Sequence, residues 1–231
     1  TAFSMFEDFS TGGYNGGSGQ IVSDNSWATA QTGSPAITTA GSTIKSGTSN
    51  VGVLEISTGT TTTGGTAITG GIFNGALNAS MALGNGVISL DALVNIPVLS
   101  NGADDASLSV ALRTNPANQA IANGVDIFYT RSTSVNWSVR CCSANTSTLI
   151  SSSTAVTAGW HHLKISVDAT AANATFFVDG VALLGSPIQT NIPVVLLSTY
   201  VSWFKVSGST ALLYGLDYLW VQKTFTTPRG T

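Results

Sequence analysis

Charged side chains are scarce in this sequence. Asp, Glu, Lys and Arg make up 8% of its 231 residues, against roughly 25% in an ordinary globular domain. The net charge is -3 and Lys and Arg form no cluster, so the electrostatic signature of a protein that binds nucleic acid or an anionic membrane is missing. Because Ser, Thr, Asn, Gly and Ala must cover much of the outside, we expect neighbouring proteins to bury part of the surface.

Long apolar runs and paired cysteines are missing as well. No stretch approaches the roughly 20 continuous apolar residues of a membrane span, and the opening residues 1–4 show no signal peptide, although a processed chain would begin in the same way. Cys141 and Cys142 are the only cysteines. Because neighbouring side chains on a strand point to opposite faces, we expect two free thiols. Two cysteines also cannot form a disulfide scaffold or a four-ligand zinc site.

Residues suited to catalysis are few. The only glutamates, Glu7 and Glu55, lie on separate predicted strands, whereas a glycosidase needs two carboxylates beside the scissile bond. His161 and His162 diverge on a strand, and the sequence has no third histidine. Neither a Gly-x-Ser-x-Gly motif nor a phosphate-binding glycine loop occurs. We therefore expect no enzyme, no catalytic residues, no cofactor and no metal site at the histidines.

The stretch from 159 to 184 gives the clearest structural signal. Leu163, Ile165 and Val167 alternate with polar residues, which is the period-two pattern of a strand with one buried face. Asp179-Gly180 separates two apolar runs and is a strong signal for a tight hairpin turn. The stretch therefore predicts three consecutive antiparallel strands.

Similar alternation recurs along the chain, and no segment shows a capped helical period. It predicts strands over 2–9, 51–57, 87–97, 108–112, 125–129, 135–141, 194–206 and 212–222. Residues 11–47 are rich in Gly, Ser, Thr and Asn and predict a long surface loop anchored by Trp27 and Ile37. Residues 58–71 predict a turn and a short edge strand. We expect an all-β fold, a two-sheet antiparallel β-sandwich that forms a single domain over residues 1–231.

Three motifs resemble one family of jelly rolls. They are Gly159-Trp160-His161-His162, then Phe176-Phe177-Val178-Asp179-Gly180, and the closing segment 216–222. This combination resembles the concanavalin A-like and laminin-G-like jelly rolls, and nearly the whole chain is similar to structural proteins of tailed bacteriophages that carry this sandwich. The resemblance implies a non-enzymatic virion protein. We expect it to decorate and stabilise a capsid as a homotrimer bound to other virion proteins, after assembly in the host cytoplasm.

A glycan-binding adhesin of a head or tail fibre is the alternative that stays open, because lectin relatives of the fold bind sugars on the concave sheet. Trp137 and Tyr129 are the candidate platforms for a sugar ring, with Trp27 and Tyr14 beside them. Each of these rings could instead pack in the core or at an interface, where aromatic side chains are common.

A calcium site is a further implication of the laminin-G-like resemblance. Asp104, Asp105 and Asp179 lie in predicted turns and could supply carboxylate ligands at one rim of the sandwich. Aspartate is equally common in turns because it accepts hydrogen bonds from the local backbone. The sequence leaves both interpretations open.

Overall fold

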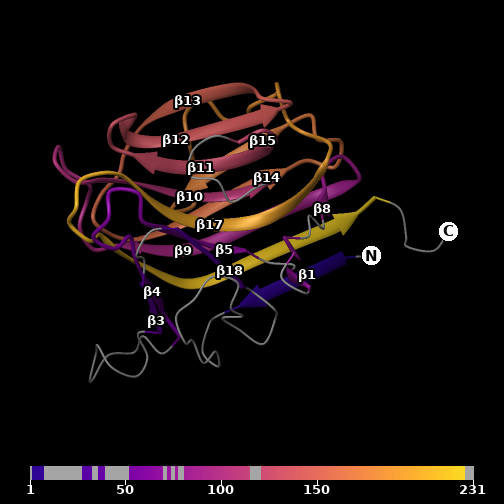
Figure 1. Ribbon diagram of the computed structural model, residues 1–231. Coiled ribbons are helices and arrows are strands. Elements are labelled where there is room, and N and C mark those ends of the chain that lie inside the picture. Colours follow the sequence, from indigo (N-terminus) through magenta and orange to yellow (C-terminus); the bar gives the residue numbers. More distant parts are fainter. Residues whose placement is uncertain are drawn as a thin grey trace.

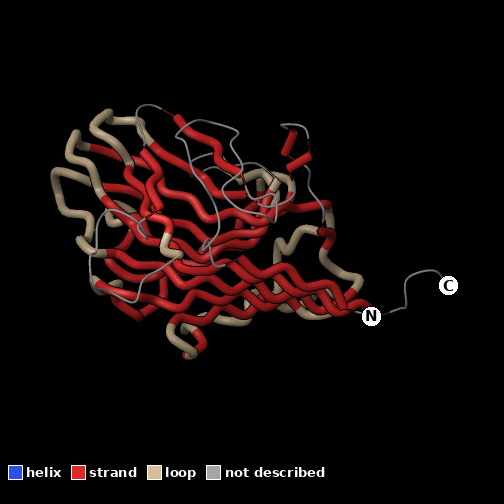
Figure 2. Tube along the Cα trace, turned by 90° about the horizontal axis from the view of Figure 1, so that it is seen from below, coloured by secondary structure: helices blue, strands red, loops and turns tan. Residues whose placement is uncertain are grey.

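The protein folds into two antiparallel sheets of eight strands that lie one over the other (Figure 1). The computed structural model describes residues 2–7, 28–32, 36–39, 52–69, 72–73, 76–77, 81–114 and 121–226. Strands make up most of these residues (Figure 2). None of the described residues forms an apolar helix of membrane-spanning length. The predicted all-β, two-sheet antiparallel sandwich is confirmed.

Sheet A has the strand order β16-β15-β14-β9-β18-β4-β3, and β1 also pairs with β18. Its strands are β1 (Ala2–Glu7), β3 (Ala36–Thr39), β4 (Leu54–Ser57), β9 (Gly86–Ile96), β14 (Gly159–Val167), β15 (Ala174–Val178), β16 (Val181–Ala182) and β18 (Leu213–Phe225). The long strand β18 pairs with β4 near its start and with β1 near its end. It therefore joins the earliest strands of the chain to the middle of the sheet.

Sheet B has the strand order β13-β12-β11-β10-β17-β5-β2, and β8 also pairs with β17. Its strands are β2 (Ala28–Thr32), β5 (Gly65–Thr69), β8 (Met81–Ala82), β10 (Asp105–Arg113), β11 (Gly124–Thr130), β12 (Ser134–Ser143), β13 (Thr146–Ala155) and β17 (Leu196–Ser207). The short strands β6 (Ile72–Phe73) and β7 (Ala76–Leu77) pair with each other.

One apolar core fills the space between the sheets. Its largest side chains include Trp137 and Trp203 from sheet B and Phe176 and Tyr214 from sheet A, all fully buried. Alternate residues of each strand supply this core, so the remaining residues form an outer face on each sheet. Those two outer faces form two of the surfaces of the sandwich.

The three consecutive strands predicted at 159–184 are confirmed as β14, β15 and β16. Leu163, Ile165 and Val167 are buried, as the alternation predicts. Asp179 and Gly180 have φ angles of 52° and 80°, and a type I′ turn requires positive φ at both central residues. The Asp-Gly pair thus fixes the register of this hairpin.

The structure corrects two predictions in the first third of the chain. Strands β2 and β3 lie within the predicted surface loop 11–47 and pair with β5 and β4. Ile37, one predicted anchor, belongs to β3, and Trp27 lies outside the described residues. Strand β5 is not an edge strand, because it lies between β17 and β2 with every residue buried. These strands are rich in threonine and glycine, so their sequences give little sign of a strand. Pairing with the neighbouring strands, and not local propensity, stabilises them.

Strand β12 carries both thiols. Cys141 contributes to the core, and Cys142 lies on the opposite face of the strand. Both are free and fully buried, which confirms the predicted free thiols. Strand β13, which pairs with β12, was not predicted, because its Ser and Thr residues give no apolar alternation.

Candidate functional site

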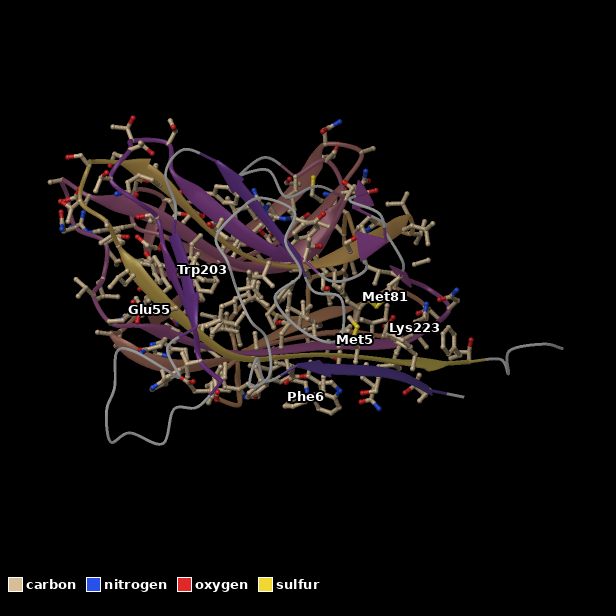
Figure 3. All side chains as sticks on the ribbon, turned by 60° about the horizontal axis from the view of Figure 1, so that its bottom comes forward. Met5, Phe6, Glu55, Met81, Trp203 and Lys223 are labelled. Atoms are coloured by element: carbon tan, nitrogen blue, oxygen red, sulfur yellow. The ribbon has the colours of Figure 1, made fainter. Side chains whose placement is uncertain are left out.

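The outer face of sheet A carries a group of partly exposed rings, which we call the aromatic face. It comprises Phe6, Trp160, His162, Phe177, Tyr218 and Trp220. Phe6 and Trp160 expose 52% and 38% of their surface, and the other four are half-buried. Figure 3 shows Phe6 pointing away from the molecule, while the adjacent Met5 points inward, where it packs against the core.

Strand register brings the rings of the aromatic face together. Trp220 on β18 pairs with Phe6 on β1 and with Asp91 on β9. Asp91 pairs in turn with Lys164 on β14, and Lys164 pairs with Phe177 on β15. Directly opposite side chains on one sheet face lie about 5 Å apart, so one row crosses five strands with rings at both ends and charges in the middle.

A second row runs along the same face. The Tyr218 ring centroid lies 5.8 Å from that of Phe6 and 6.2 Å from that of His162. These separations are typical of interacting aromatic pairs. The three rings therefore form a continuous aromatic strip across sheet A.

Trp160 lies at the end of the face beside a glycine. A Cβ atom added at Gly215 would come within 3.6 Å of the Trp160 ring and 3.1 Å of the Asn95 Cβ. Gly215 pairs with both Asn95 and Glu55, so it sits between two polar side chains. An added Cβ would be in ordinary contact with the indole and would crowd the Asn95 Cβ, so the indole packs closely over this strand.

Asp91 is the polar centre of the aromatic face. Its carboxylate, only 3% exposed, contacts His162 Nε2 at 2.9 Å and Lys164 Nζ at 3.7 Å, and it accepts a hydrogen bond from Ser89 Oγ at 2.9 Å. Burial raises the pKa of the adjacent Tyr218 hydroxyl, and the negative charge of Asp91 adds to the shift. The network holds the polar groups in fixed positions between the rings.

The outer face of sheet B has a different character, because it contains a small polar pocket with a volume of about 90 Å³. We call it the Arg113 pocket, and its lining includes Ser107, Ser109, Arg113, Asp126, Phe128 and Arg140. Asp126 and Arg140 form a two-pronged ion pair, with N–O distances of 3.0 and 2.6 Å. Arg113 is fully buried and donates a hydrogen bond from Nη2 to Ser202 Oγ at 2.9 Å.

The two ring platforms predicted from the sequence lie elsewhere. Trp137 and Tyr129 are 0% and 2% exposed and pack edge to face in the core, with centroids 6.3 Å apart. The structure therefore corrects their assignment as sugar platforms, because both side chains are on the inward positions of their strands. Trp27 and Tyr14 lie outside the described residues.

The two histidines diverge as predicted. His161 is buried, with Nδ1 2.9 Å from an Asp179 carboxylate oxygen and Nε2 2.8 Å from the carbonyl of Thr157. His162 points to the aromatic face and contacts Asp91. Both ring nitrogens of His161 and Nε2 of His162 are thus held by protein groups, and the two rings share no ligand position.

The aspartates proposed for calcium each accept hydrogen bonds from the backbone. Asp104 accepts from Thr210 N, Asp105 from the backbone amides of Arg131 and Ser132, and Asp179 from His162 N. Within the described ranges, no three His, Cys, Asp or Glu side chains gather as a metal ion would require. Asp104 and Asp179 lie in turns and Asp105 begins β10, and the amides that they bind belong to distant segments and not to the local backbone.

The aromatic face could have been found from the sequence. Once Leu163 and Ile165 are assigned to the core, the period of two places Trp160, His162 and Lys164 on the opposite face. The contribution of β1 and β18 was not accessible in this way, because it depends on the pairing of residues more than 200 positions apart, such as Phe6 and Trp220.

Sequence comparison assigns a family. The model of the SO2946-like, C-terminal domain family matches residues 49–211. The chain belongs to this family. No curated protein matches this SO2946-like domain in sequence.

Three solved structures share the fold of this SO2946-like domain. A β-1,3-1,4-glucanase (lichenase) from a mouse hindgut metagenome is 13% identical with a TM-score of 0.58, covering 95% of this chain and 98% of that one. The Bacillus licheniformis β-glucanase is 13% identical with a TM-score of 0.52, covering 96% and 97%. The binding domain of botulinum neurotoxin DC, in complex with SialylT, is 9% identical with a TM-score of 0.52.

The alignment with the neurotoxin binding domain covers 86% of this chain but 43% of that chain, so this SO2946-like domain spans less than half of its length. Together the three similarities show a concanavalin A-like jelly roll. That part of the resemblance seen in the sequence is confirmed.

Proposed function

We propose that this domain binds glycan chains through the aromatic face and does not hydrolyse them. The observation that carries the proposal is the strip formed by Phe6, Tyr218 and His162, which lies partly exposed beside fixed polar groups. A sugar ring has apolar C–H faces and polar hydroxyl edges. A surface that alternates rings with polar side chains is complementary to both.

The dimensions of the aromatic face suit a chain of several sugars. The face crosses β15, β14, β9, β18 and β1, which is about 19 Å at the usual strand spacing. Lys164, Asn95 and Gln222 are half-buried on this side of the sheet and can bind hydroxyl groups. The proposal also agrees with the fold, which is shared by two glucanases and by a toxin binding domain solved in complex with SialylT.

Asp91 and Glu55, two carboxylates of sheet A, are too far apart to act together in glycosidase chemistry. Strand register separates the Cα atoms of Asp91 and Glu55 by two strands and four residues, which is roughly 17 Å at standard spacings. A glycosidase holds its two carboxyl groups about 5 to 9.5 Å apart. Asp91 is moreover engaged by His162 and Lys164. Binding without hydrolysis is therefore the activity that these residues support.

A glycan array followed by titration calorimetry tests the proposal. Trp160→Ala and Tyr218→Ala should each weaken binding of the best array ligand about tenfold, the loss expected for one stacked ring. Val135→Ala is the control, since Val135 is 59% exposed on β12 of the other sheet. If the wild-type protein binds no glycan, or if Trp160→Ala binds like the wild type, the aromatic face is not a glycan site.

A second candidate function, a structural role in an assembly, is favoured by an apolar groove at one end of the sandwich. The groove has a volume of about 340 Å³ and is lined by Phe3, Met81, Leu196, Lys223 and Phe225. Figure 3 shows Met81 and Lys223 at this end of the molecule. Lys223 Nζ donates to the Ala82 carbonyl at 2.6 Å, so its charge is held at the groove wall.

The scarcity of charge and this groove support a virion protein that stabilises a capsid as a homotrimer, by burying surface against its neighbours. None of the similar proteins named above is a virion protein. Light scattering after size-exclusion chromatography tests the assembly. A trimer has three times the chain mass of 23.6 kDa, and Leu196→Asp should dissociate it. A wild-type monomer at every concentration would exclude this role.

A further inference from the structure

We infer that the Arg113 pocket binds the carboxylate of an acidic sugar, at a second site on the opposite sheet from the aromatic face. The pocket is built from β10, β11, β12 and β13 of sheet B, whereas the aromatic face belongs to sheet A. The inference therefore stands or falls independently of the glycan-binding role proposed above.

Two hydrogen-bond donors without partners converge in this pocket. Arg113 Nε and Ser109 Oγ are both buried and have no hydrogen-bond partner among the described residues. Arg113 lies four residues from Ser109 on β10, but its guanidinium reaches Ser202, and Ser202 pairs directly with Ser109. Ala111 lies between the two residues on β10, and its small side chain leaves room for the Arg113 side chain to extend to Ser202. The guanidinium thus arrives beside the Ser109 hydroxyl.

The pocket also carries one positive charge without a direct ionic partner. Asp126 is engaged on both oxygens by Arg140. Among the described residues Arg113 forms no ion pair; it donates to the Ser202 hydroxyl and lies over the Tyr200 ring, 5.2 Å from Arg113 Cζ to the ring centroid. Leaving a buried charged donor unsatisfied is costly. An anion with two oxygens would satisfy both Arg113 Nε and the Ser109 hydroxyl.

The rest of the lining indicates which anion fits. A volume of about 90 Å³ admits a carboxylate group and not a whole sugar ring, and the planar guanidinium matches a carboxylate. The Ser107 and Thr130 hydroxyls meet at 2.8 Å on the wall, and Thr133 and Leu149 form an exposed rim. Hydroxyl-rich walls and a rim that combines the Thr133 hydroxyl with the Leu149 side chain suit a polyhydroxy ligand, so we assign the carboxylate to a sugar acid.

Matched ligand pairs test the inference on the full chain by calorimetry or by NMR titration. Methyl β-D-glucuronide is compared with its neutral methyl ester, and 3′-sialyllactose is compared with its neutral carboxyl methyl ester. In at least one pair, the acid should bind about tenfold more tightly or better, as expected for a charge-assisted hydrogen bond. The pair that shows the larger difference identifies the ligand as a uronic or a sialic acid.

Substitutions then locate the charge that is responsible. Arg113→Gln should abolish the preference for the acid, and Arg113→Lys should reduce it because the planar fork is lost. Arg131→Gln is the matched control, since it removes the same charge from an exposed position and should leave the preference intact. Ser109→Ala should weaken binding of the acid severalfold.

Two results would overturn the inference: equal binding of acid and neutral ligand in both pairs, or an acid preference that survives Arg113→Gln. If Arg113→Gln does not fold, amide shifts of the wild-type protein decide. Titration with the acid should move the amide signals of Ser109 and Phe128, and unmoved signals refute the site. Trp160→Ala should bind the acid like the wild type, which separates this site from the aromatic face.

Discussion

Arg113 shows how the fold accommodates a charge deep in a sheet face. Burial lowers the pKa of Arg113 to about 10, and the field of Asp126 opposes the shift. The side chain therefore remains positively charged at neutral pH. The position of Arg113 depends on Gly124, the residue of β11 that pairs with it. A Cβ atom at Gly124 would lie 2.6 Å from the Arg113 Cβ and 2.7 Å from the Leu112 carbonyl oxygen.

Gly124→Ala should consequently destabilise the protein, because neither the backbone carbonyl nor the Arg113 Cβ can move away easily. We expect a loss of about 1 to 3 kcal/mol in the free energy of unfolding, the usual cost of overpacking. Urea denaturation measures it. Gly102→Ala is the control, since only the flexible end of Arg131, 3.9 Å away, faces that position. Equal stabilities of the two variants would contradict the predicted clash.

Asp168 gives a prediction about acid stability. Its carboxylate accepts hydrogen bonds from Asn173 Nδ2 at 2.6 Å and from the Ala172 and Thr170 amides. The Asn173 contact, followed by the backbone contacts, lowers the pKa of Asp168 from 3.8 to about 2. Because the folded state holds the ionised form, this contribution to stability is complete above pH 4 and is lost as the pH falls toward 2.

An NMR titration of the carboxyl carbon should show Asp168 titrating near pH 2, well below an unperturbed aspartate. Asp168→Asn should be less stable than the wild type at neutral pH, and the difference should vanish as the pH approaches 2. A normal pKa, or a difference that persists at pH 2, would show that the turn does not depend on the ionised carboxylate.

At the scale of single elements, the two thiols of strand β12 show by their reactivity whether this strand separates from its neighbours. The adjacent thiols of Cys141 and Cys142 point to opposite faces and are both fully buried. Burial raises the pKa of the Cys141 thiol, which further suppresses the reactive thiolate. Cys142 Sγ lies 2.9 Å from the Ile121 carbonyl oxygen. Either thiol can react only when β12 separates from its surroundings.

We therefore expect no reaction of the native protein with Ellman's reagent over minutes, and release of two equivalents after unfolding in guanidinium. Cys142→Ser is a useful comparison, since it should leave one equivalent and keep the native protein unreactive. Fast labelling of the native wild type would mean that β12 is not closed on both faces.

How well each element could be predicted depended on its own alternation. Strand β14 was predictable because one face is apolar and the other polar, and the Asp179-Gly180 turn was predictable because few residue pairs adopt positive φ together. The central position of β5 and the existence of β13 were not predictable, since β5 is buried on both faces and β13 is exposed on most of its residues. Neither pattern shows a period of two.

At the scale of the whole molecule, stability and binding are carried by different tryptophans. Trp137 fills the core and Trp160 lies on the aromatic face. Trp137→Ala should cost about 3 to 5 kcal/mol of the free energy of unfolding, while Trp160→Ala should cost about 1 kcal/mol or less. Thermal and urea denaturation distinguish the two. A Trp160→Ala variant as unstable as Trp137→Ala would mean that this ring belongs to the fold and not to a surface.

The candidate sites illustrate what one sequence can and cannot give. Trp137 and Tyr129 were chosen because large aromatic residues are common in sugar sites, but the same residues are favoured in cores, and only the sheet face decides between the two. Arg113 was not singled out at all. Its importance arises from its neighbours Ser202 and Asp126, which lie on two other strands.

The last two strands occupy central positions: β17 lies between β10 and β5, and β18 lies between β9 and β4. During synthesis on the ribosome, the earlier strands of this domain therefore lack a neighbouring strand until residues 196–225 have emerged. Strand pairing between such distant segments is slow, because the segments must come together before any contact between them stabilises the pair. Nascent chains that end before residue 196 hold neither β17 nor β18, so they expose open sheet edges that chaperones would have to shield.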